Sequence, residues 1–248
     1  MKPFLIIETG DPVPDLRRHG GFGHWIRVAA GLPRQAARCV RVHDGEDLPD
    51  PSRFAGVLVS GSGAMVTDRA DWSERSAAWL GDAARAGHPV FGICYGHQLL
   101  AHALGGEVAH HPEGVEIGTV TVQRHPTAAD DPLLGELPDA FAAQAVHWQS
   151  VRRLPPGAVL LAGSAHEAHH AFRVGEQAWG VQFHPEFSVD ALRAYLDGLG
   201  PTLAREGRDA AQIAAGLQGT PEAASLLPRF ARLVLSESRS NGPRAPRA

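Results

Sequence analysis

Lysine, cysteine and long apolar runs are all scarce in this chain. Of its 23 basic residues, 22 are arginine and only Lys2 is lysine, which excludes mechanisms that need an interior lysine, such as a Schiff base or a Walker A phosphate loop. Two cysteines, Cys39 and Cys94, cannot build a disulfide framework and favour a reducing, cytoplasmic environment. No segment approaches the roughly 18 apolar residues of a membrane span. The net charge of −4 argues against nucleic acid or a membrane surface as a partner.

Short apolar runs alternate with helix-like segments over the first half of the chain. With 248 residues, of which 44% are apolar, the chain can bury a substantial core. The alternation is typical of an open parallel α/β sheet. From about residue 107 to 183 the pattern changes to strands and turns, which indicates an antiparallel addition. Residues 189–236 return to helical spacing, with Thr220 as the N-cap of the last helix.

A cysteine follows the fourth expected strand. Gly92-x-Cys94-x-Gly96 joins an apolar run to a helix, and glycines on both sides suit a turn with no room for Cβ atoms. This is the arrangement of a nucleophile elbow, and the start of a helix favours thiolate. We therefore predict that Cys94 is a nucleophile, with a buried structural thiol as the alternative. Cys39, within an expected strand, is predicted to be such a structural cysteine.

A histidine and a carboxylate follow the last expected strand, residues 178–183. In an extended segment residues i and i+2 point to the same side, so Glu186 can reach the face that His184 uses. A thiol nucleophile needs a base, and the base needs an orienting group. His184 and Glu186 suit these two roles; an incidental histidine and a solvated glutamate in a turn are the alternative.

Together, the G-x-C-x-G-x-Q motif around Cys94 and the F-H-P-E motif around His184 resemble the class I (triad) glutamine amidotransferases. Within that family the chain is similar to stand-alone proteins related to the amidotransferase domain of GMP synthetase. The resemblance implies a flavodoxin-like α/β fold: an open, mainly parallel sheet with helices on both faces, an antiparallel addition and a C-terminal helical extension. The expected division is residues 1–190 for the amidotransferase-like domain, 191–236 for the helical extension and 237–248 for a disordered tail.

The resemblance implies a catalytic triad of Cys94, His184 and Glu186. In that mechanism the thiolate attacks the side-chain amide carbon of glutamine, ammonia leaves, and a γ-glutamyl thioester forms. Water then releases glutamate, with Glu186 holding the imidazole in position. No metal and no organic cofactor is expected to take part.

The resemblance also implies an oxyanion hole built from backbone amides. One amide is that of Tyr95, directly after the nucleophile. The second is expected in the turn after the strand AGVLVS, with Ser62 as the first candidate and Gly61 as the second. The family has a Ser-Gly-Gly-Pro type of loop there, whereas this chain has Ser-Gly-Ser-Gly and so lacks the proline.

Substrate-binding residues are carried over from two further positions. Gln98 matches a family position that contacts the bound glutamine. The segment His147-Trp148-Gln149 corresponds to one whose backbone meets the α-amino and α-carboxylate groups. Trp148 and Gln149 depart from the small residue that is common there, so this tryptophan is expected to narrow or reshape the pocket.

Three other functions remain open at this point. A free-standing γ-glutamyl amide or peptide hydrolase would use the same triad on a different leaving group. A binding or regulatory subunit would keep the residues without the activity. A zinc metalloprotease is suggested by H-E-x-x-H at His166–His170, but that motif needs a helix and here lies between two strand-like segments.

Family members normally pass ammonia to a synthetase that activates an acceptor. The amidotransferase-like part and its helical extension leave no room for a fused synthetase, and the scarcity of lysine excludes a Walker-type ATP loop. We therefore expect a small-molecule substrate, glutamine or a γ-glutamyl compound. A separate synthetase subunit is the expected partner, unless hydrolysis is the whole activity.

Overall fold

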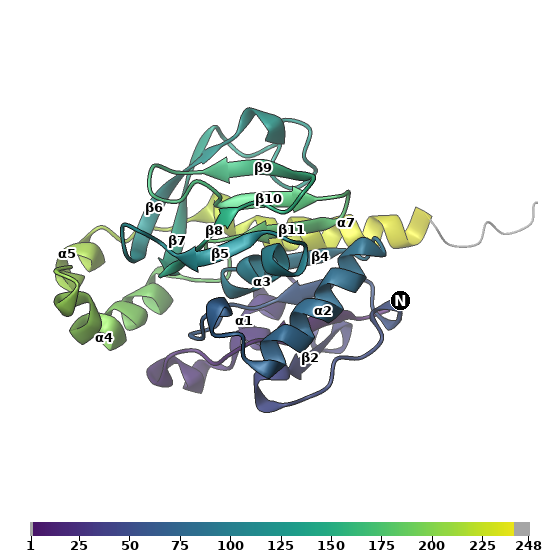
Figure 1. The fold of residues 1–248 in the computed structure, drawn as a ribbon, viewed down its shortest axis with the longest axis horizontal. Helices are drawn as coiled ribbons and strands as arrows, with labels where there is room; N and C mark the ends of the chain where they lie inside the picture. Colours follow the sequence, from purple (N-terminus) through teal and green to yellow (C-terminus); the bar gives the residue numbers. More distant parts are fainter. Residues whose placement is uncertain (1, 241–248) are drawn as a thin grey trace, which may run out of the picture.

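One mixed sheet runs through the middle of the molecule (Figure 1). Within residues 2–240, which this computed structural model describes, the sheet has nine strands in the order β2-β1-β3-β4-β11-β10-β9-β6-β7. Its strands are β1 (Phe4–Glu8), β2 (Ala37–Arg41), β3 (Val57–Val59), β4 (Val90–Ile93), β6 (Glu116–Arg124), β7 (Ala140–His147), β9 (Ala158–Gly163), β10 (Ala171–Val174) and β11 (Ala178–Val181). A separate two-stranded sheet pairs β5 (Glu107–His110) with β8 (Gln149–Arg153).

The first five strands in this order are parallel, and the remaining four are antiparallel to their neighbours. Helices cover both faces of the parallel part. The α-helices of residues 2–240 are α1 (Phe22–Ala29), α2 (Asp71–Arg85), α3 (Tyr95–Ala103), α4 (Val189–Arg205), α5 (Ala210–Ala215), α6 (Pro221–Ala224) and α7 (Leu226–Ser240). Of these, α5 packs on β6 and α6 packs on β7, in the antiparallel part. The expected flavodoxin-like class, with an antiparallel addition and C-terminal helices, is confirmed.

Alternating side chains of the buried strands explain the two covered faces. Phe4 and Ile6 of β1 pack in the core that α1 and α7 close, whereas Leu5 and Ile7 pack in the core beneath α2 and α3. Because both faces are buried, such strands are continuous apolar runs in the sequence. The carboxyl ends of β1, β3, β4 and β11 meet at one edge of the sheet, where open α/β sheets bind ligands.

Two strands, β7 and β8, lie where none was expected. β7 is rich in alanine and has only one aromatic and one β-branched residue, Phe141 and Val146, so its segment gives no clear strand signal. It forms nevertheless because it pairs with β6 along its whole length at the edge of the sheet. A second difference concerns β11, which was expected in the antiparallel part but also pairs in parallel with β4.

The C-terminal helices differ from the expected single last helix. The helix breaks at Ser225 between α6 and α7, because Pro228 has no N–H to donate to the carbonyl four residues earlier. Thr220 precedes α6 as expected, but its side chain makes no capping hydrogen bond. α7 continues to Ser240, so residues 237–240 are helical and not part of a disordered tail. The rest of that predicted tail, residues 241–248, lies outside the described residues, and the domain division at residue 190 stays a prediction.

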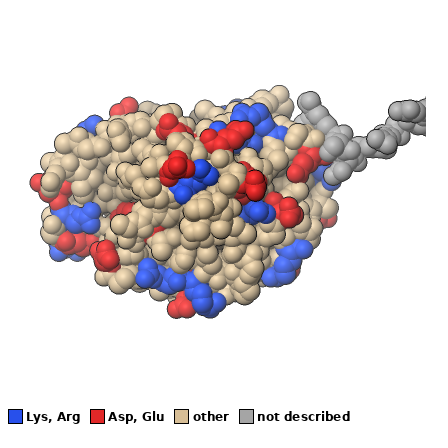
Figure 2. Space-filling view, turned by 90° about the horizontal axis from the view of Figure 1, so that it is seen from above, with Lys and Arg blue, Asp and Glu red and all other residues tan. Residues whose placement is uncertain are grey.

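Charges of both signs are mixed on one face of the molecule. Figure 2 shows Lys and Arg interspersed with Asp and Glu on the face seen there, with large neutral areas between them. None of the helices within residues 2–240 is long and apolar enough to cross a membrane.

Candidate active site

Cys94 occupies a strained turn between β4 and α3. Its backbone has φ 50° and ψ −101°, a conformation that costs a non-glycine residue about 1–3 kcal/mol. The turn is tight: a Cβ at Gly92 would lie 2.4 Å from the carbonyl oxygen of Gly96, and a Cβ at Gly96 would lie 2.7 Å from that of Val59. Only glycine fits at both positions, which is the geometry expected for a nucleophile elbow.

His184 and Glu186 follow β11 at the same edge of the sheet. His184 Nδ1 and Glu186 Oε1 are 2.8 Å apart, and both side chains are buried. His184 Nε2 makes no hydrogen bond among the described residues, so it is free for proton transfer. A Cβ on Gly61 would lie 2.8 Å from His184 Cε1 and 3.6 Å from the Cβ of Cys94, so the imidazole and the cysteine meet over this glycine.

The surroundings of His184 favour its charged form. Burial lowers the pKa of His184, but the carboxylate of Glu186 and the nearby sulfur of Cys94 outweigh burial and raise it to about 10. The ring is therefore an imidazolium at neutral pH. The sulfur of Cys94 therefore lies beside a cation and at the N-terminus of α3, which are the surroundings in which reactive cysteines are found.

The second cysteine contradicts its prediction, because Cys39 is exposed and not buried. β2 is an edge strand, so this residue has a neighbouring strand on one side only. Its sulfur lies against α1, where a Cβ on Gly23 would approach it to 2.7 Å. Although the residue as a whole is exposed, its sulfur is partly buried against α1. This burial and the carboxylate of Glu8 raise the pKa of Cys39 to about 11, so this thiol is a poor nucleophile at neutral pH.

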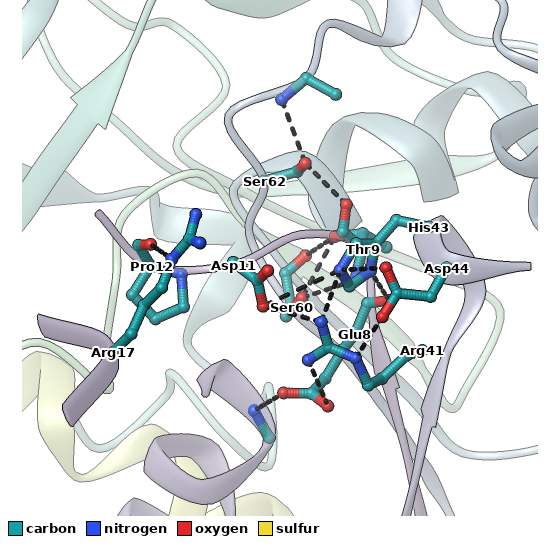
Figure 3. A network of polar contacts seen from close by, with 12 residues as sticks. Glu8, Thr9, Asp11, Pro12, Arg17, Arg41, His43, Asp44, Ser60 and Ser62 are labelled. Carbon is teal, nitrogen blue, oxygen red and sulfur yellow. Dashed lines mark hydrogen bonds and ion pairs between the residues drawn. The ribbon is translucent and has the colours of Figure 1, made fainter. Parts of the chain in front are cut away.

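The loop after β3 is fixed to the loop after β1 by hydroxyl groups (Figure 3). The Ser62 hydroxyl donates to the Thr9 carbonyl at 2.7 Å and accepts from the Ala64 amide at 3.1 Å. The Thr9 hydroxyl lies 2.9 Å from the Gly61 carbonyl, to which it donates. These hydrogen bonds fix the conformation of the loop in which the family has a proline and this chain has none. The Gly96 amide donates to the Ser60 carbonyl at 3.1 Å, which ties the same loop to the elbow.

Replacing Gly61 with alanine is expected to lower kcat about 100-fold, because the new methyl group would displace the imidazole of His184. The matched control is Gly63→Ala in the same loop, where an added Cβ meets nothing within 4 Å. Steady-state rates of amide hydrolysis for both variants, with circular dichroism to check folding, test this expectation. Equal rates for the two variants would show that the imidazole tolerates the displacement.

A cavity of about 270 Å³ opens beside Cys94. Nine of its wall residues were anticipated or lie next to anticipated positions: Ser62, Gly63, Cys94, Tyr95, Gln98, His147, Trp148, Gln149 and His184. Tyr95 begins α3, so its amide has no partner within the helix. The structure thus places Ser62 and Tyr95 at the wall of the cavity beside Cys94, whereas Gly61, the second candidate in the loop, is not one of its wall residues.

The side-chain amide nitrogen of Gln98 is bonded to other parts of the protein. Its Nε2 donates to the Gln149 carbonyl at 2.7 Å and to Gln182 Oε1 at 2.9 Å, which uses both of its hydrogens. What Gln98 can offer a ligand is therefore its Oε1, an acceptor suited to an ammonium or amide N–H.

Trp148 and Gln149 line the cavity, but their polar atoms contact other parts of the protein. Trp148 Nε1 donates to Glu206 Oε1 at 2.9 Å, which ties the turn between β7 and β8 to the C-terminal end of α4. Gln149 Nε2 donates to Thr67 Oγ1 at 2.5 Å. The tryptophan is part of the cavity wall, and its narrowing of the pocket stays a prediction.

His147 at the same turn has acceptors at both ring nitrogens. Its Nδ1 lies 3.0 Å from the Gln149 carbonyl and its Nε2 lies 2.8 Å from Glu116 Oε2. Burial raises the pKa of Glu116, but hydrogen bonds from His147 and His170 outweigh it and hold that pKa well below its usual range. This buried pair fixes the turn that carries Trp148.

Part of the cavity wall was missed by sequence reasoning. The segment after β1 contributes Asp11, Pro12, Val13, Pro14 and Arg17, and α4 contributes Tyr195 and Leu199. A signal was available for the first group, because a loop that follows the carboxyl end of a central parallel strand borders the ligand crevice of open α/β sheets. Nothing in the helical spacing of residues 189–205 points to the cavity.

The H-E-x-x-H segment does not form a zinc-protease helix. His166–His170 lies in the loop between β9 and β10, so the two histidines do not share a helix face. His166 stacks on His111 at 4.0 Å, and His170 Nε2 lies 3.3 Å from Glu116 Oε2. Within the described chain, no three His, Cys, Asp or Glu side chains are placed to hold a metal ion.

Comparison with known proteins gives consistent matches. The family model "Glutamine amidotransferase class-I" matches residues 36–196. The chain is 28% identical over 200 residues to gamma-glutamyl peptidase 4 of Arabidopsis thaliana. This match covers 79% of this chain and 80% of that protein. It is 39% identical over 141 residues to the glutamine-hydrolyzing GMP synthase of Thermomicrobium roseum. That match covers 57% of this chain but 25% of the synthase, so the chain spans about a quarter of that relative's length.

Solved structures match over nearly the whole chain. A glutamine amido transferase from Methylobacillus flagellatus has a TM-score of 0.74 at 26% identity, covering 100% of this chain and 98% of that one. A glutamine amidotransferase from Thermotoga maritima has a TM-score of 0.75 at 19% identity, covering 94% and 99%, and supports the fold alone.

Proposed function

Because the chain belongs to the class I glutamine amidotransferase family, we propose that it hydrolyses the γ-amide of glutamine, or of a related γ-glutamyl compound, through a thioester on Cys94. One observation carries this proposal. Cys94 lies in a strained elbow beside a buried imidazole that is bonded to a carboxylate at 2.8 Å. A nucleophile, a base and an orienting group in this order are what acyl transfer through a thiol requires.

The first half of the reaction forms the thioester. The Cys94 thiolate attacks the amide carbon, and the negative charge moves to the amide oxygen. Amides of Tyr95 and Ser62 are proposed to stabilise that oxyanion, with Gly61 as the second candidate in the loop. The C–N bond then breaks while the His184 imidazolium gives its proton to the departing nitrogen. Ammonia, or an amine, leaves and the γ-glutamyl group stays bonded to sulfur.

The second half restores the enzyme. His184, now neutral, takes a proton from water as the water oxygen attacks the thioester carbon. The C–S bond breaks, glutamate is released, and the thiolate and imidazolium re-form. Glu186 keeps the ring oriented in both halves and stabilises its charged form, so no metal or organic cofactor is needed.

Substrate recognition follows from the walls of the cavity. We assign Gln98 Oε1, the backbone at Gln149 and the indole of Trp148 to the γ-glutamyl part of the substrate. The GMP synthase relatives favour a partner protein, a synthetase subunit that takes up the released ammonia. The gamma-glutamyl peptidase relative instead favours hydrolysis as the whole activity. A reducing compartment such as the cytoplasm suits a thiol nucleophile.

The direct test measures products with the purified chain. Incubation with glutamine or γ-glutamyl amides is expected to release glutamate and the amine in equal amounts, without added metal or nucleotide. Chelator-treated protein serves as the control and should keep its rate. Failure to release glutamate from any γ-glutamyl amide, by protein shown to be folded, would refute the proposed function.

A further inference from the structure

The charged groups around the cavity are unequally compensated. Asp11 lies 3.0 Å from an Arg41 guanidinium nitrogen, His147 lies against Glu116, and His184 against Glu186. Arg17 also lines the cavity, but it forms no ion pair with any carboxylate in the part of the chain that the structure describes. Asp11 shares Arg41 with Glu8 and Asp44, so its side of the cavity is well supplied with negative charge. Arg17 is the guanidinium at the cavity wall that no carboxylate of the described residues pairs with, and it favours an anionic group on the part of the ligand beside it.

Arg17 is held in a defined position by its own loop. It belongs to a short 3-10 helix (Pro14–His19), and its Nε donates to the Pro12 carbonyl at 3.1 Å. Figure 3 shows the side chain folded against Pro12, apart from the carboxylates around Arg41. One edge of the guanidinium is thus used by the protein, while its two terminal nitrogens remain for a ligand. A carboxylate is the planar group that such a fork binds.

The position of this loop relates it to the leaving group. The departing nitrogen receives its proton from His184, so the leaving group must lie beside that ring. Phe187 stacks on His184 at 4.1 Å and packs on Tyr195 at 5.1 Å. The hydroxyl of Tyr195 interacts in turn with the backbone of Val13. The loop that carries Arg17 therefore lies on the side of the cavity formed by His184. Gln98 and Gln149 come from α3 and β8, which form another part of the wall.

We propose that Arg17 is a specificity-determining residue that binds the carboxylate of an amino-acid leaving group. The preferred substrates would then be γ-glutamyl amino acids rather than glutamine itself. This inference rests on the proposed function and names its leaving group. The bond that breaks joins the γ-carbon to the amino-acid nitrogen, which leaves with a proton from His184; water replaces it on the γ-glutamyl carbon.

The test compares three substrates that share the γ-glutamyl group. γ-Glutamyl-alanine carries the leaving-group carboxylate, γ-glutamyl-ethylamide lacks only that carboxylate, and glutamine releases ammonia. The protein is expected to hydrolyse γ-glutamyl-alanine with a kcat/KM about 10- to 100-fold above that for the ethylamide. Arg17→Gln should remove this preference through a higher KM for γ-glutamyl-alanine, with little change for the ethylamide and for glutamine.

Arg18→Gln is the matched control, since Arg18 is the exposed neighbour and lies outside the cavity. It should keep the preference, and Arg17→Lys should keep part of it. If Arg17→Gln weakens all three substrates equally, Arg17 binds the α-carboxylate of the γ-glutamyl part and the inference is wrong. If the unmodified protein hydrolyses all three without preference, the inference fails while the proposed function stands. If it hydrolyses none, the proposed function itself fails.

Discussion

Replacing Cys94 with serine is expected to abolish amide hydrolysis, with kcat reduced by at least about 10⁴-fold. The expected loss is large because serine keeps the shape of the elbow but not its chemistry. A serine hydroxyl must lose its proton during the attack, and an imidazole whose charged form is favoured by Glu186 is a poor acceptor for that proton. A thiol gives up its proton far more readily than a hydroxyl does, so attack by sulfur depends less on a base.

Cys39→Ser is the matched control for this experiment. Cys39 lies on edge strand β2, outside the cavity, and should tolerate the change with less than about a twofold effect on kcat/KM. Glutamate release measured with an enzyme-coupled assay separates the two variants. Residual activity of Cys94→Ser within about tenfold of the unmodified protein would remove Cys94 from the mechanism.

Replacing His184 with alanine should cost about 10³- to 10⁴-fold in kcat, because the ring acts in both halves of the reaction. Without it the thiolate loses its cation and the departing nitrogen loses its proton donor. Single-turnover measurements should show that both formation and hydrolysis of the thioester become slow. His110→Ala, at an exposed histidine of β5, is the control and should leave both steps unchanged. A loss below about tenfold for His184→Ala would exclude it as the proton donor.

The charge on His184 also sets the sign of the pH dependence. Its pKa is raised from 6.5 to about 10, so the charged form is favoured in the folded protein. The stabilising contribution of this charge is fully present below pH 6.5 and is lost as the pH rises through about 10. We expect kcat/KM to fall over the same alkaline range, and Glu186→Gln to move that fall to lower pH by about 1–3 units. An alkaline limb near pH 6.5 in the unmodified protein would contradict the proposed ion pair.

The buried parallel strands could be predicted because each is a short apolar run next to a turn. β7 could not, since its alanine-rich sequence gains strand structure only by pairing with β6. The break at Ser225 was readable in principle from Pro228, but the apolar spacing of the last helix continues across it. Cys39 was misjudged because strand order is not visible in a strand's own sequence, and an edge strand exposes what a central strand buries.

The residues of the site likewise fall into two groups: those that a short sequence pattern predicts, and those that reach the site only through the packing of distant segments. The glycines at 92 and 96 and the spacing of His184 and Glu186 act over a few residues, so they could be read directly. Arg17 and Tyr195 reach the cavity only through the packing of the loop after β1 and of α4 around His184. Their roles depend on which strand ends lie together, and no local pattern encodes that arrangement.

Trapping the nucleophile tests the central claim most directly. A diazoketone analogue of glutamine carries its reactive carbon near the amide position and alkylates the attacking thiolate. Intact-mass and peptide analysis at neutral pH should find one adduct per chain, on Cys94, and glutamine should slow its formation. Cys39 should stay unmodified although it is exposed, because its pKa is about 11. Modification of Cys39 at an equal rate, or an unlabelled Cys94, would contradict the account.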